Sequence, residues 1–294
     1  PPPPPSPPTF FNDTATTEIY TNTESSAASD VYKRQGRMNR GAGPDEVLAG
    51  IPGWRGASYS ELPGGLTNRT LLVEKDGRRA VLKIDPSPRS APYNSRQDEA
   101  RIQERAAALG RANGVLYVED TVLLCEWGEG KVWPRAHFDV DENLWRVARA
   151  LREIHTWPLP GKTFDAAAAA QLYAGSLDAS LSGAAERHLA VVEAAPGPMN
   201  LCCCHNDLVA ENIIATPGIR FQDWEYACDN DPLFDLAVVV AHHGLSDRQA
   251  RVLLDAYFNG DGDSWSRQLG VQMQLYDSLN WLWSVAGAAV AEPE

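Results

Sequence analysis

The chain has 294 residues, of which 44% are hydrophobic, so it is long and apolar enough for one large domain or two lobes. Its net charge of −13 argues against a nucleic-acid-binding protein, because neutralising phosphates requires clusters of Lys and Arg that the sequence lacks. No apolar run approaches the about 18 residues of a membrane span, and five cysteines with three adjacent favour the reducing cytoplasm over a disulfide framework.

Residues 1–36 differ in composition from the rest of the chain. They open with a polyproline run and continue without helical or alternating periodicity. The string resembles translated sequencing-adapter DNA, a contaminant of assembled genes. A Pro-rich natural leader is the alternative, although the segment lacks the apolar centre of a signal peptide. We expect a disordered leader that plays no part in the function.

Residues 37–127 predict a small lobe rich in β-strands. The runs "TLLVEK" (70–75) and "RAVLKID" (79–85) flank "DGR", which is a hairpin turn signal. The runs "GVLYVED" and "TVLLCEW" indicate a second hairpin. Between the hairpins we expect one helix, which Asn94 or Ser95 can cap. One face of this helix carries Glu99, Ile102, Ala106 and Leu109.

Residues 128–294 predict a larger, mainly helical part. A helical stripe runs from Leu144 to Ile154 behind Asp139 or Asp141 as the cap. The segment 246–258 begins with Ser246 and Gln249 at the spacing of a capping box. A final amphipathic helix is expected over about residues 264–288. Among these helices, residues 201–236 indicate short strands around a loop.

The cysteine run at 202–204 and the adjacent His205 include residue types that bind zinc. Neighbouring residues of a strand point to opposite faces, so one tetrahedral site could not use all three cysteines. We therefore interpret the cysteines as small core residues.

The string "GKT" at 161–163 is a second weak signal. A phosphate-binding loop would need Gly where Thr156 stands, and no strand leads into the segment. We interpret Lys162 as a solvated loop residue.

Phosphoryl transfer fits the residues better. Asp207 and Asn212 stand in the pattern H-x-D-x-x-x-x-N, and Asp223 follows a short strand. The reaction requires a carboxylate near the acceptor hydroxyl and oxygen ligands for Mg²⁺. We assign the first role to Asp207 and the metal to Asn212 and Asp223. If the strand continues past Asp223, Glu225 shares its face, where it could bind metal through water or face a substrate cation.

The strings "HNDLVAEN" and "IRFQDWEYACDNDPLFDLAVV" resemble the choline/ethanolamine kinase and aminoglycoside phosphotransferase superfamily, above all its bacterial choline-kinase-like and thiamine-kinase-like members. The resemblance covers about residues 60–290 and is strongest over 201–240. It implies an α+β, bilobal, protein-kinase-like fold with a nucleotide-binding N-lobe (37–127) and a catalytic, substrate-binding C-lobe (128–294). It also implies ATP and Mg²⁺ as cofactors.

The resemblance assigns further residues to the nucleotide and to the catalytic loop. Lys83 would pair with the α- and β-phosphates, and Glu99, which faces inward, would be its partner. His205 would brace the catalytic loop, and Asp235 would anchor that loop from the following helix. His155 is expected to be a hydrogen-bonded core residue. The string "LPGGLTNRT" (62–70) resembles the nucleotide loop, with contacts from Gly65, Thr67 and Asn68.

Aromatic residues near the C-terminus favour a cationic acceptor, because quaternary ammonium groups bind aromatic faces and carboxylates reinforce them. The string "NWLWS" resembles the W-x-x-W-S region of choline kinases, but Asn280 replaces its first Trp and Trp281 is shifted by one. Ordinary helix packing is the alternative. The expected cation-binding group is Tyr226, Tyr276, Trp281 and Trp283.

We expect an ATP-dependent kinase that phosphorylates a small amine alcohol. Choline or ethanolamine ranks ahead of thiamine, and aminoglycosides rank lower. One alternative is a catalytically silent nucleotide-binding module, which the presence of Lys83, Asp207, Asn212 and Asp223 disfavours. The other alternative is a zinc-binding or redox protein.

Overall fold

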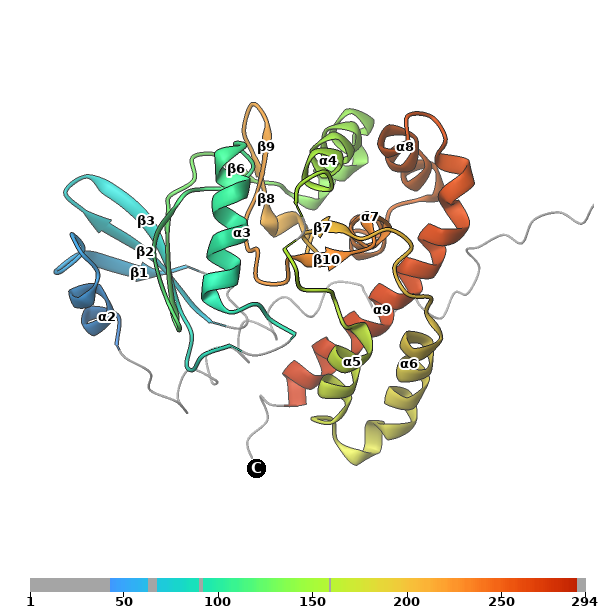
Figure 1. Ribbon diagram of the computed structural model, residues 1–294, viewed down its shortest axis with the longest axis horizontal. Coiled ribbons are helices and arrows are strands. Elements are labelled where there is room, and N and C mark those ends of the chain that lie inside the picture. The colour runs from blue at the N-terminus through green and yellow to red at the C-terminus, as the bar shows by residue number, and fades with distance from the viewer. Residues whose placement is uncertain (1–42, 63–67, 90–91, 159, 290–294) are drawn as a thin grey trace, which may run out of the picture.

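The computed structural model describes residues 43–62, 68–89, 92–158 and 160–289. The predicted leader and the predicted nucleotide-loop residues Gly65 and Thr67 lie outside the described residues. Figure 1 shows two parts side by side, which we call the N-lobe (the five-stranded sheet with α2 and α3) and the C-lobe (the elements from β6 to α9).

The two predicted hairpins form most of the N-lobe sheet. Its antiparallel strands are ordered β1-β2-β3-β5-β4. Asp76 and Gly77 join β2 to β3 with φ values of 51° and 74°, the left-handed backbone that a two-residue hairpin turn requires. The strands are β1 Ser58–Glu61, β2 Arg69–Lys75, β3 Arg78–Ile84, β4 Val115–Glu119 and β5 Val122–Glu126.

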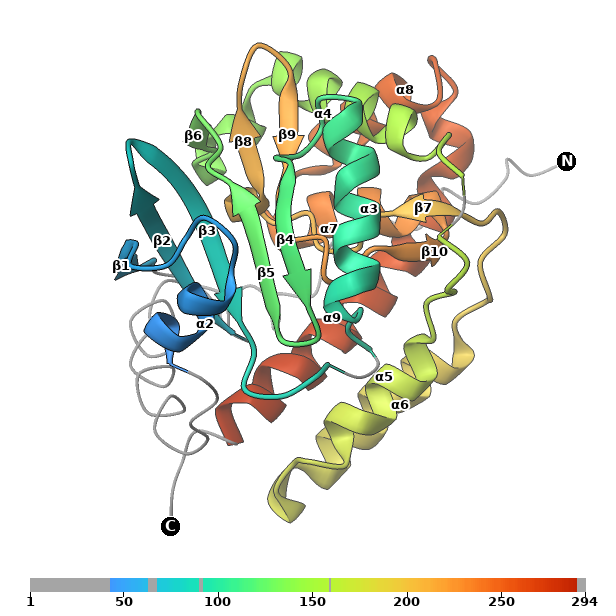
Figure 2. The same cartoon turned by 60° about the vertical axis from the view of Figure 1, so that its left-hand side comes forward.

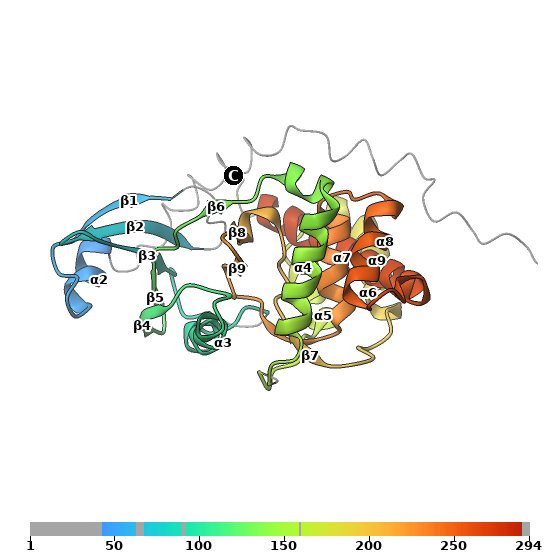
Figure 3. The same ribbon diagram turned by 90° about the horizontal axis from the view of Figure 1, so that it is seen from above.

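Successive strand residues point to opposite faces of the sheet, and a helix covers each face. Leu82 and Ile84 of β3 belong to the cluster that includes Leu48 of α2 (Pro44–Gly50). On the other face, Leu123 packs with Ala100 of α3 (Arg96–Ala108). Figure 2 shows α3 running alongside β4, and Figure 3 shows α2 on the side of the sheet away from the C-lobe. Lys83, between Leu82 and Ile84, therefore points towards α3.

The predicted helix between the hairpins is α3. Of the two candidate caps, Ser95 takes the role, and its hydroxyl oxygen accepts a hydrogen bond from the backbone N–H of Asp98 at 3.1 Å. Glu99 is fully buried, as predicted, whereas Leu109 is the C-cap residue that follows the helix and is 52% exposed. The prediction for Leu109 was wrong because the helix stops one residue earlier.

Helices account for most of the C-lobe. The capping box between Ser246 and Gln249 is present at the start of α8. Neither Asp139 nor Asp141 caps α4, because Asp141 is already its first residue and Val140 holds the cap position. The helices are α4 Asp141–Ile154, α5 Ala166–Ala174, α6 Ser182–Ala194, α7 Pro232–His242, α8 Asp247–Tyr257 and α9 Ser266–Ala289, with short 3-10 helices at η1 Arg135–Asp139, η2 Ala179–Leu181, η3 Ala210–Asn212 and η4 Gly262–Trp265.

Short strands carry the segment that contains the predicted catalytic residues. β7 (Cys202–Cys204) pairs with β10 (Cys228–Asn230), and β8 (Ile213–Ala215) pairs with both β6 (Lys131–Val132) and β9 (Ile219–Phe221). Figure 3 shows β8 and β9 between the N-lobe sheet and the C-lobe helices. Residues 205–212 and 222–227 therefore lie at the junction of the lobes.

The architecture confirms the predicted α+β, bilobal, kinase-like fold. The N-lobe sheet ends at Glu126, next to the predicted domain boundary at residue 127, which remains a proposal. Among the helices of the described residues, none combines the length and the apolarity that crossing a membrane requires.

Candidate active site

The loop after β7 is anchored by hydrogen bonds to a residue of α7. The carboxylate of Asp235, which is completely buried, accepts hydrogen bonds from the backbone N–H groups of His205 at 2.9 Å and Asn206 at 2.7 Å. The His205 ring shares a 3.0 Å hydrogen bond with the Gln222 carbonyl through Nε2. Asn206 has a φ of 66°, so the chain turns sharply before Asp207. His205 and Asp235 thus occupy the positions that their proposed bracing and anchoring roles need.

Asp207 and Asn212 are hydrogen-bonded to each other. The Asn212 amide nitrogen donates to the Asp207 carboxylate at 2.8 Å and to the Asp207 carbonyl at 2.9 Å. Because the nitrogen is used in this way, the amide oxygen of Asn212 is directed elsewhere and is the donor atom suited to a hard cation. Asn212 belongs to η3, directly before β8, so its position is set by the small sheet.

Lys83 joins the two lobes. Its ammonium group lies 2.7 Å from Asp223 Oδ1 and 3.3 Å from Glu99 Oε1, although Asp223 is 140 residues further along the chain. Burial favours the neutral amine, but the charges of Asp223 and Glu99 outweigh it and raise the pKa of Lys83. Lys83 is therefore a cation at neutral pH, as pairing with nucleotide phosphates requires.

The electrostatic environment shifts the pKa values of Asp207 and Asp223 in opposite directions. Burial, together with the negative charge of Asp223, raises the pKa of Asp207 to about 7. At Asp223 burial acts in the same direction, but the neighbouring Lys83 lowers the pKa below its ordinary value. At neutral pH Asp223 is thus ionised and suited to a metal, while Asp207 is close to its titration point and suited to accept a proton.

We expect the pH dependence of turnover to report this raised pKa. Proton acceptance needs the Asp207 carboxylate, which is lost as the pH falls below about 7. The value of kcat/KM should therefore fall about tenfold per pH unit below about 7 and level off above it. Initial rates between pH 5.5 and 9 would measure the profile, and a flat profile down to pH 5.5 would contradict the assignment.

Glu225 does not share a strand face with Asp223. β9 ends at Phe221, and Asp223 has a φ of 64°, so the chain turns instead of continuing as a strand. Glu225 is 5% exposed and lies 2.6 Å from Arg89, a partly buried residue of the loop after β3. Burial and the charge of Asp223 raise its pKa to about 8 against the opposing effect of Arg89. The strand continuation on which the predicted position of Glu225 depended is therefore not present.

The expected aromatic group is only partly formed. The Tyr226 ring lies 5.0 Å from that of Tyr93, and the Trp283 N–H donates to the Tyr93 hydroxyl at 3.4 Å. The side chain of Tyr173 of α5 lies close enough to that of Tyr226 to interact with it. We call Tyr93, Tyr173, Tyr226 and Trp283 the aromatic group; each of them is partly buried. Tyr93 and Tyr173 were missed because neither lies in a motif or at a helical spacing from the others.

The structure does not bring the other two predicted aromatic residues to this group. The Tyr276 hydroxyl shares a 2.8 Å hydrogen bond with His242. Trp281 stacks on His188 of α6, with 4.3 Å between ring centroids. Both contacts are packing between C-lobe helices, which was the alternative interpretation for these residues.

Lys162 is not the solvated loop residue that the sequence suggested. It is partly buried, and its ammonium group donates to the Tyr93 carbonyl at 3.1 Å and to the Asn94 side-chain oxygen at 3.2 Å. Both acceptors belong to the loop between β3 and α3. Sequence spacing could not predict this contact, because Lys162 lies 69 residues from Tyr93 and 68 from Asn94.

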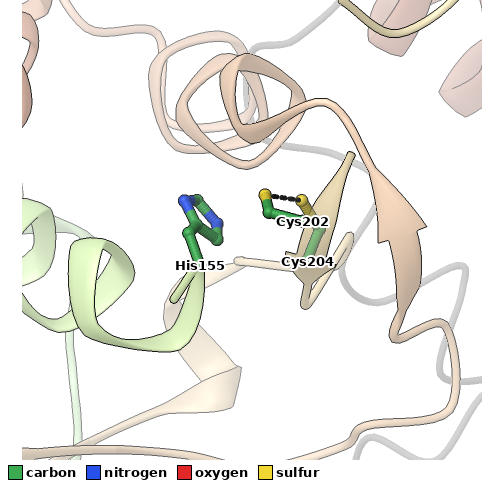
Figure 4. A group of neighbouring side chains, drawn as sticks. All are labelled: His155, Cys202 and Cys204. Carbon is green, nitrogen blue, oxygen red and sulfur yellow. Dashed lines mark hydrogen bonds between the residues drawn. The ribbon is translucent and has the colours of Figure 1, made fainter. Parts of the chain in front are cut away.

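Two of the three adjacent cysteines, Cys202 and Cys204, lie next to His155. Figure 4 shows Cys202 and Cys204 beside His155, and one ligand atom from each residue lies within 4.8 Å of the other two. Each group already has a hydrogen-bond partner: Tyr257 and Asp235 for the His155 ring, and the Asn230 and Asp231 carbonyls for the two thiols. These bonds account for the cluster as part of the hydrogen-bonded core beneath the catalytic loop.

Asn68 is the one predicted nucleotide-loop residue that the structure describes. It is 4% exposed at the start of β2, and its side-chain oxygen accepts a hydrogen bond from the Thr70 hydroxyl at 2.8 Å. Its burial beside the sheet fits a residue that shapes the loop backbone, and its contact with nucleotide remains a proposal.

The chain resembles known kinases over most of its length. Residues 58–269 match the phosphotransferase enzyme family. Thiamine kinase of Salmonella typhi is 28% identical over 218 residues, which are 72% of this chain and 75% of that protein. The crystal structure of a choline/ethanolamine kinase family protein from Mesorhizobium loti is 25% identical, with a TM-score of 0.64 over 84% of this chain and 86% of that one.

A second similarity is higher in identity and covers a shorter part of the chain. Protein LicA of Haemophilus influenzae is 47% identical over 57 residues, which are 19% of this chain. This match spans about a fifth (21%) of the length of LicA. Because the family match covers most of the chain, including Lys83 and the whole segment from Asp207 to Asp223, the chain belongs to the phosphotransferase enzyme family.

Proposed function

We propose that the protein transfers the γ-phosphoryl group of ATP to the hydroxyl of a small cationic metabolite, with choline or ethanolamine favoured over thiamine and aminoglycosides. The observation that carries the proposal is the 2.7 Å contact between Lys83 and Asp223 beside the Asp207–Asn212 pair. This contact supports the proposal because phosphoryl transfer requires a cation for the phosphates, oxygen atoms for the metal and a proton acceptor, and side chains able to supply them lie at this junction.

The residues present fit ATP and Mg²⁺. Lys83, held by Glu99, would bind the phosphates, and the Asp223 carboxylate and Asn212 amide oxygen would hold Mg²⁺. Bound Mg²⁺ supplies charge that balances the phosphate oxygens during transfer. Asp207 would orient the acceptor hydroxyl and take its proton. A silent nucleotide-binding module is disfavoured, because Lys83, Asp207, Asn212 and Asp223 are all present.

The acceptor class follows from the aromatic group and the surrounding charge. The Asn206 side chain donates to the Tyr226 carbonyl at 2.9 Å, so the catalytic loop and the aromatic group are adjacent. Partly exposed rings beside carboxylates favour an ammonium group. The Glu225 carboxylate already forms an ion pair with Arg89. The aromatic faces therefore contribute more to binding an ammonium group than this carboxylate does. This balance favours a quaternary ammonium such as choline.

Thiamine is the second candidate, because a relative that covers most of the chain is named thiamine kinase. Its positively charged thiazolium ring would also suit aromatic faces. Release of ADP with choline, ethanolamine, thiamine and an aminoglycoside in parallel would rank the acceptors. Turnover with none of these alcohols would contradict the proposed substrate class.

A matched pair of tryptophan variants tests the site directly. Trp283→Ala removes one face of the aromatic group, so the KM for choline should rise roughly 2- to 30-fold while the KM for ATP stays unchanged. Trp281→Ala, on the same helix but stacked on His188, is the control and should leave the choline KM within about twofold. Equal effects of both variants would contradict this location for the cation.

A further inference from the structure

Lys162 extends from a segment whose backbone is fixed against β10. The Lys162 carbonyl accepts a 2.8 Å hydrogen bond from the Asp229 N–H, and the Phe164 N–H donates to the Asp229 carbonyl at 3.0 Å. The Gly161 N–H donates to the Asp229 carboxylate at 3.0 Å. The side chain of Lys162 therefore starts from a rigid point of the C-lobe.

The ammonium group of Lys162 reaches the N-lobe. It donates to two oxygens of the loop between β3 and α3, the Tyr93 carbonyl and the Asn94 side-chain oxygen. Hydrogen bonds from a charged donor are stronger than neutral ones, and these lie in a partly buried position. A single C-lobe cation thus holds this N-lobe loop at two adjacent points.

Asn94 carries the connection on to the turn after Asp223. It is 1% exposed, and its amide nitrogen donates to the Ala227 carbonyl at 2.7 Å and the Trp224 carbonyl at 3.3 Å. Its backbone N–H donates to the Glu225 carbonyl at 2.8 Å. A buried side-chain amide needs partners for both its nitrogen and its oxygen, and Lys162 serves the oxygen.

Tyr93 is the point at which this connection meets the acceptor site. Its carbonyl accepts from Lys162, while its ring lies against Tyr226 and its hydroxyl accepts from Trp283. Tyr93 is the N-lobe member of the aromatic group, because the other three come from the C-lobe. The position of the Tyr93 ring therefore depends on how its backbone is held.

We propose that Lys162 is a positioning residue for the acceptor site: it holds Tyr93 and Asn94 so that the N-lobe wall of the aromatic group is in place for the acceptor cation. The ion pairs of Lys83 with Glu99 and Asp223 do not involve Lys162. Loss of Lys162 should therefore weaken acceptor binding and leave ATP binding unchanged. The role in acceptor binding rests on the proposed function, whereas the connection between the three segments does not.

The test replaces Lys162 by Met, which keeps the length of the side chain and removes its donors. We expect the KM for the preferred amine alcohol to rise roughly tenfold or more, with the KM for ATP within about twofold of the wild type. Lys162→Arg, which keeps a charged donor, should recover part of the loss. Lys131→Met, at an exposed position of β6, is the matched control and should change neither constant.

Hydrogen exchange of the unliganded protein separates the connection from the substrate assignment. In Lys162→Met the amides of residues 92–96 and 224–230 should exchange faster, and those of the N-lobe sheet should not change. Faster exchange there without turnover of any tested alcohol would support the connection and reject the acceptor class. Unchanged exchange, or equal increases in the KM for ATP and for the acceptor, would overturn the proposal.

Discussion

Replacing Asp207 by Asn should lower kcat by a factor of about 10² to 10⁴, the range that a positioned proton acceptor contributes. The substitution keeps the size of the side chain and allows an oxygen to remain next to the Asn212 amide, but it removes the carboxylate. ATP binding should persist, because Lys83 contacts Asp223 and Glu99 rather than Asp207. Steady-state kinetics and nucleotide titration would measure the two effects.

The nearby carboxylate of Glu211 provides the control for Asp207. Glu211 is exposed, and its charge contributes to the raised pKa of Asp207 without any bond to it. Glu211→Gln should therefore leave kcat within about twofold and move the acidic limb of the pH profile slightly towards lower pH. If Asp207→Asn retained more than a tenth of the wild-type kcat, Asp207 would not be the proton acceptor.

Replacing Asp235 by Ala should lower the free energy of unfolding by about 3–5 kcal/mol, because several buried partners lose their acceptor together. The backbone N–H groups of His205 and Asn206 and the ring of His155 all bond to this one carboxylate. Turnover should also fall, since these bonds hold the loop that carries Asp207. Urea unfolding followed by circular dichroism would measure the stability change.

Asp231 is the matched comparison for Asp235. It stands at the start of the same helix, where its carboxylate accepts from the backbone N–H groups of Leu233 and Met199, each at 2.9 Å. Asp231→Ala should cost about 0.5–2 kcal/mol, the usual range for a lost helix cap. If Asp235→Ala fails to fold, Asp235→Asn, which keeps one acceptor oxygen, should give an intermediate loss. A loss at Asp235 no larger than at Asp231 would contradict the anchoring role.

The aromatic residues of α9 illustrate why motif similarity was insufficient. Successive residues of a helix are rotated by about 100°, so Trp281 and Trp283 point about 200° apart and cannot line one site together. Tyr276 shares the face of Trp283 but lies about two turns, roughly 10 Å, away along the helix axis. The helical periodicity was readable in the sequence, and it was the resemblance to a Trp-containing motif that suggested a joint role.

The sequence by itself determined the local features: the Asp76–Gly77 hairpin turn, the Ser246–Gln249 capping box and the five-residue spacing that lets Asn212 bond Asp207. Each depends on backbone preferences or contacts within a few residues, so short-range physics is sufficient. Similarity to a family supplied the pairing of Lys83 with Glu99.

Only the tertiary structure decided the contacts between segments that no motif connects. Arg89 forms an ion pair with Glu225, and the Lys162 ammonium group donates hydrogen bonds to Tyr93 and Asn94 across the junction of the lobes. A charged side chain bonds whichever opposite charge or carbonyl the fold brings within about 3 Å, and sequence distance carries no information about that choice. The left-handed turn at Asp223 likewise redirects Glu225 away from the face that strand alternation predicted.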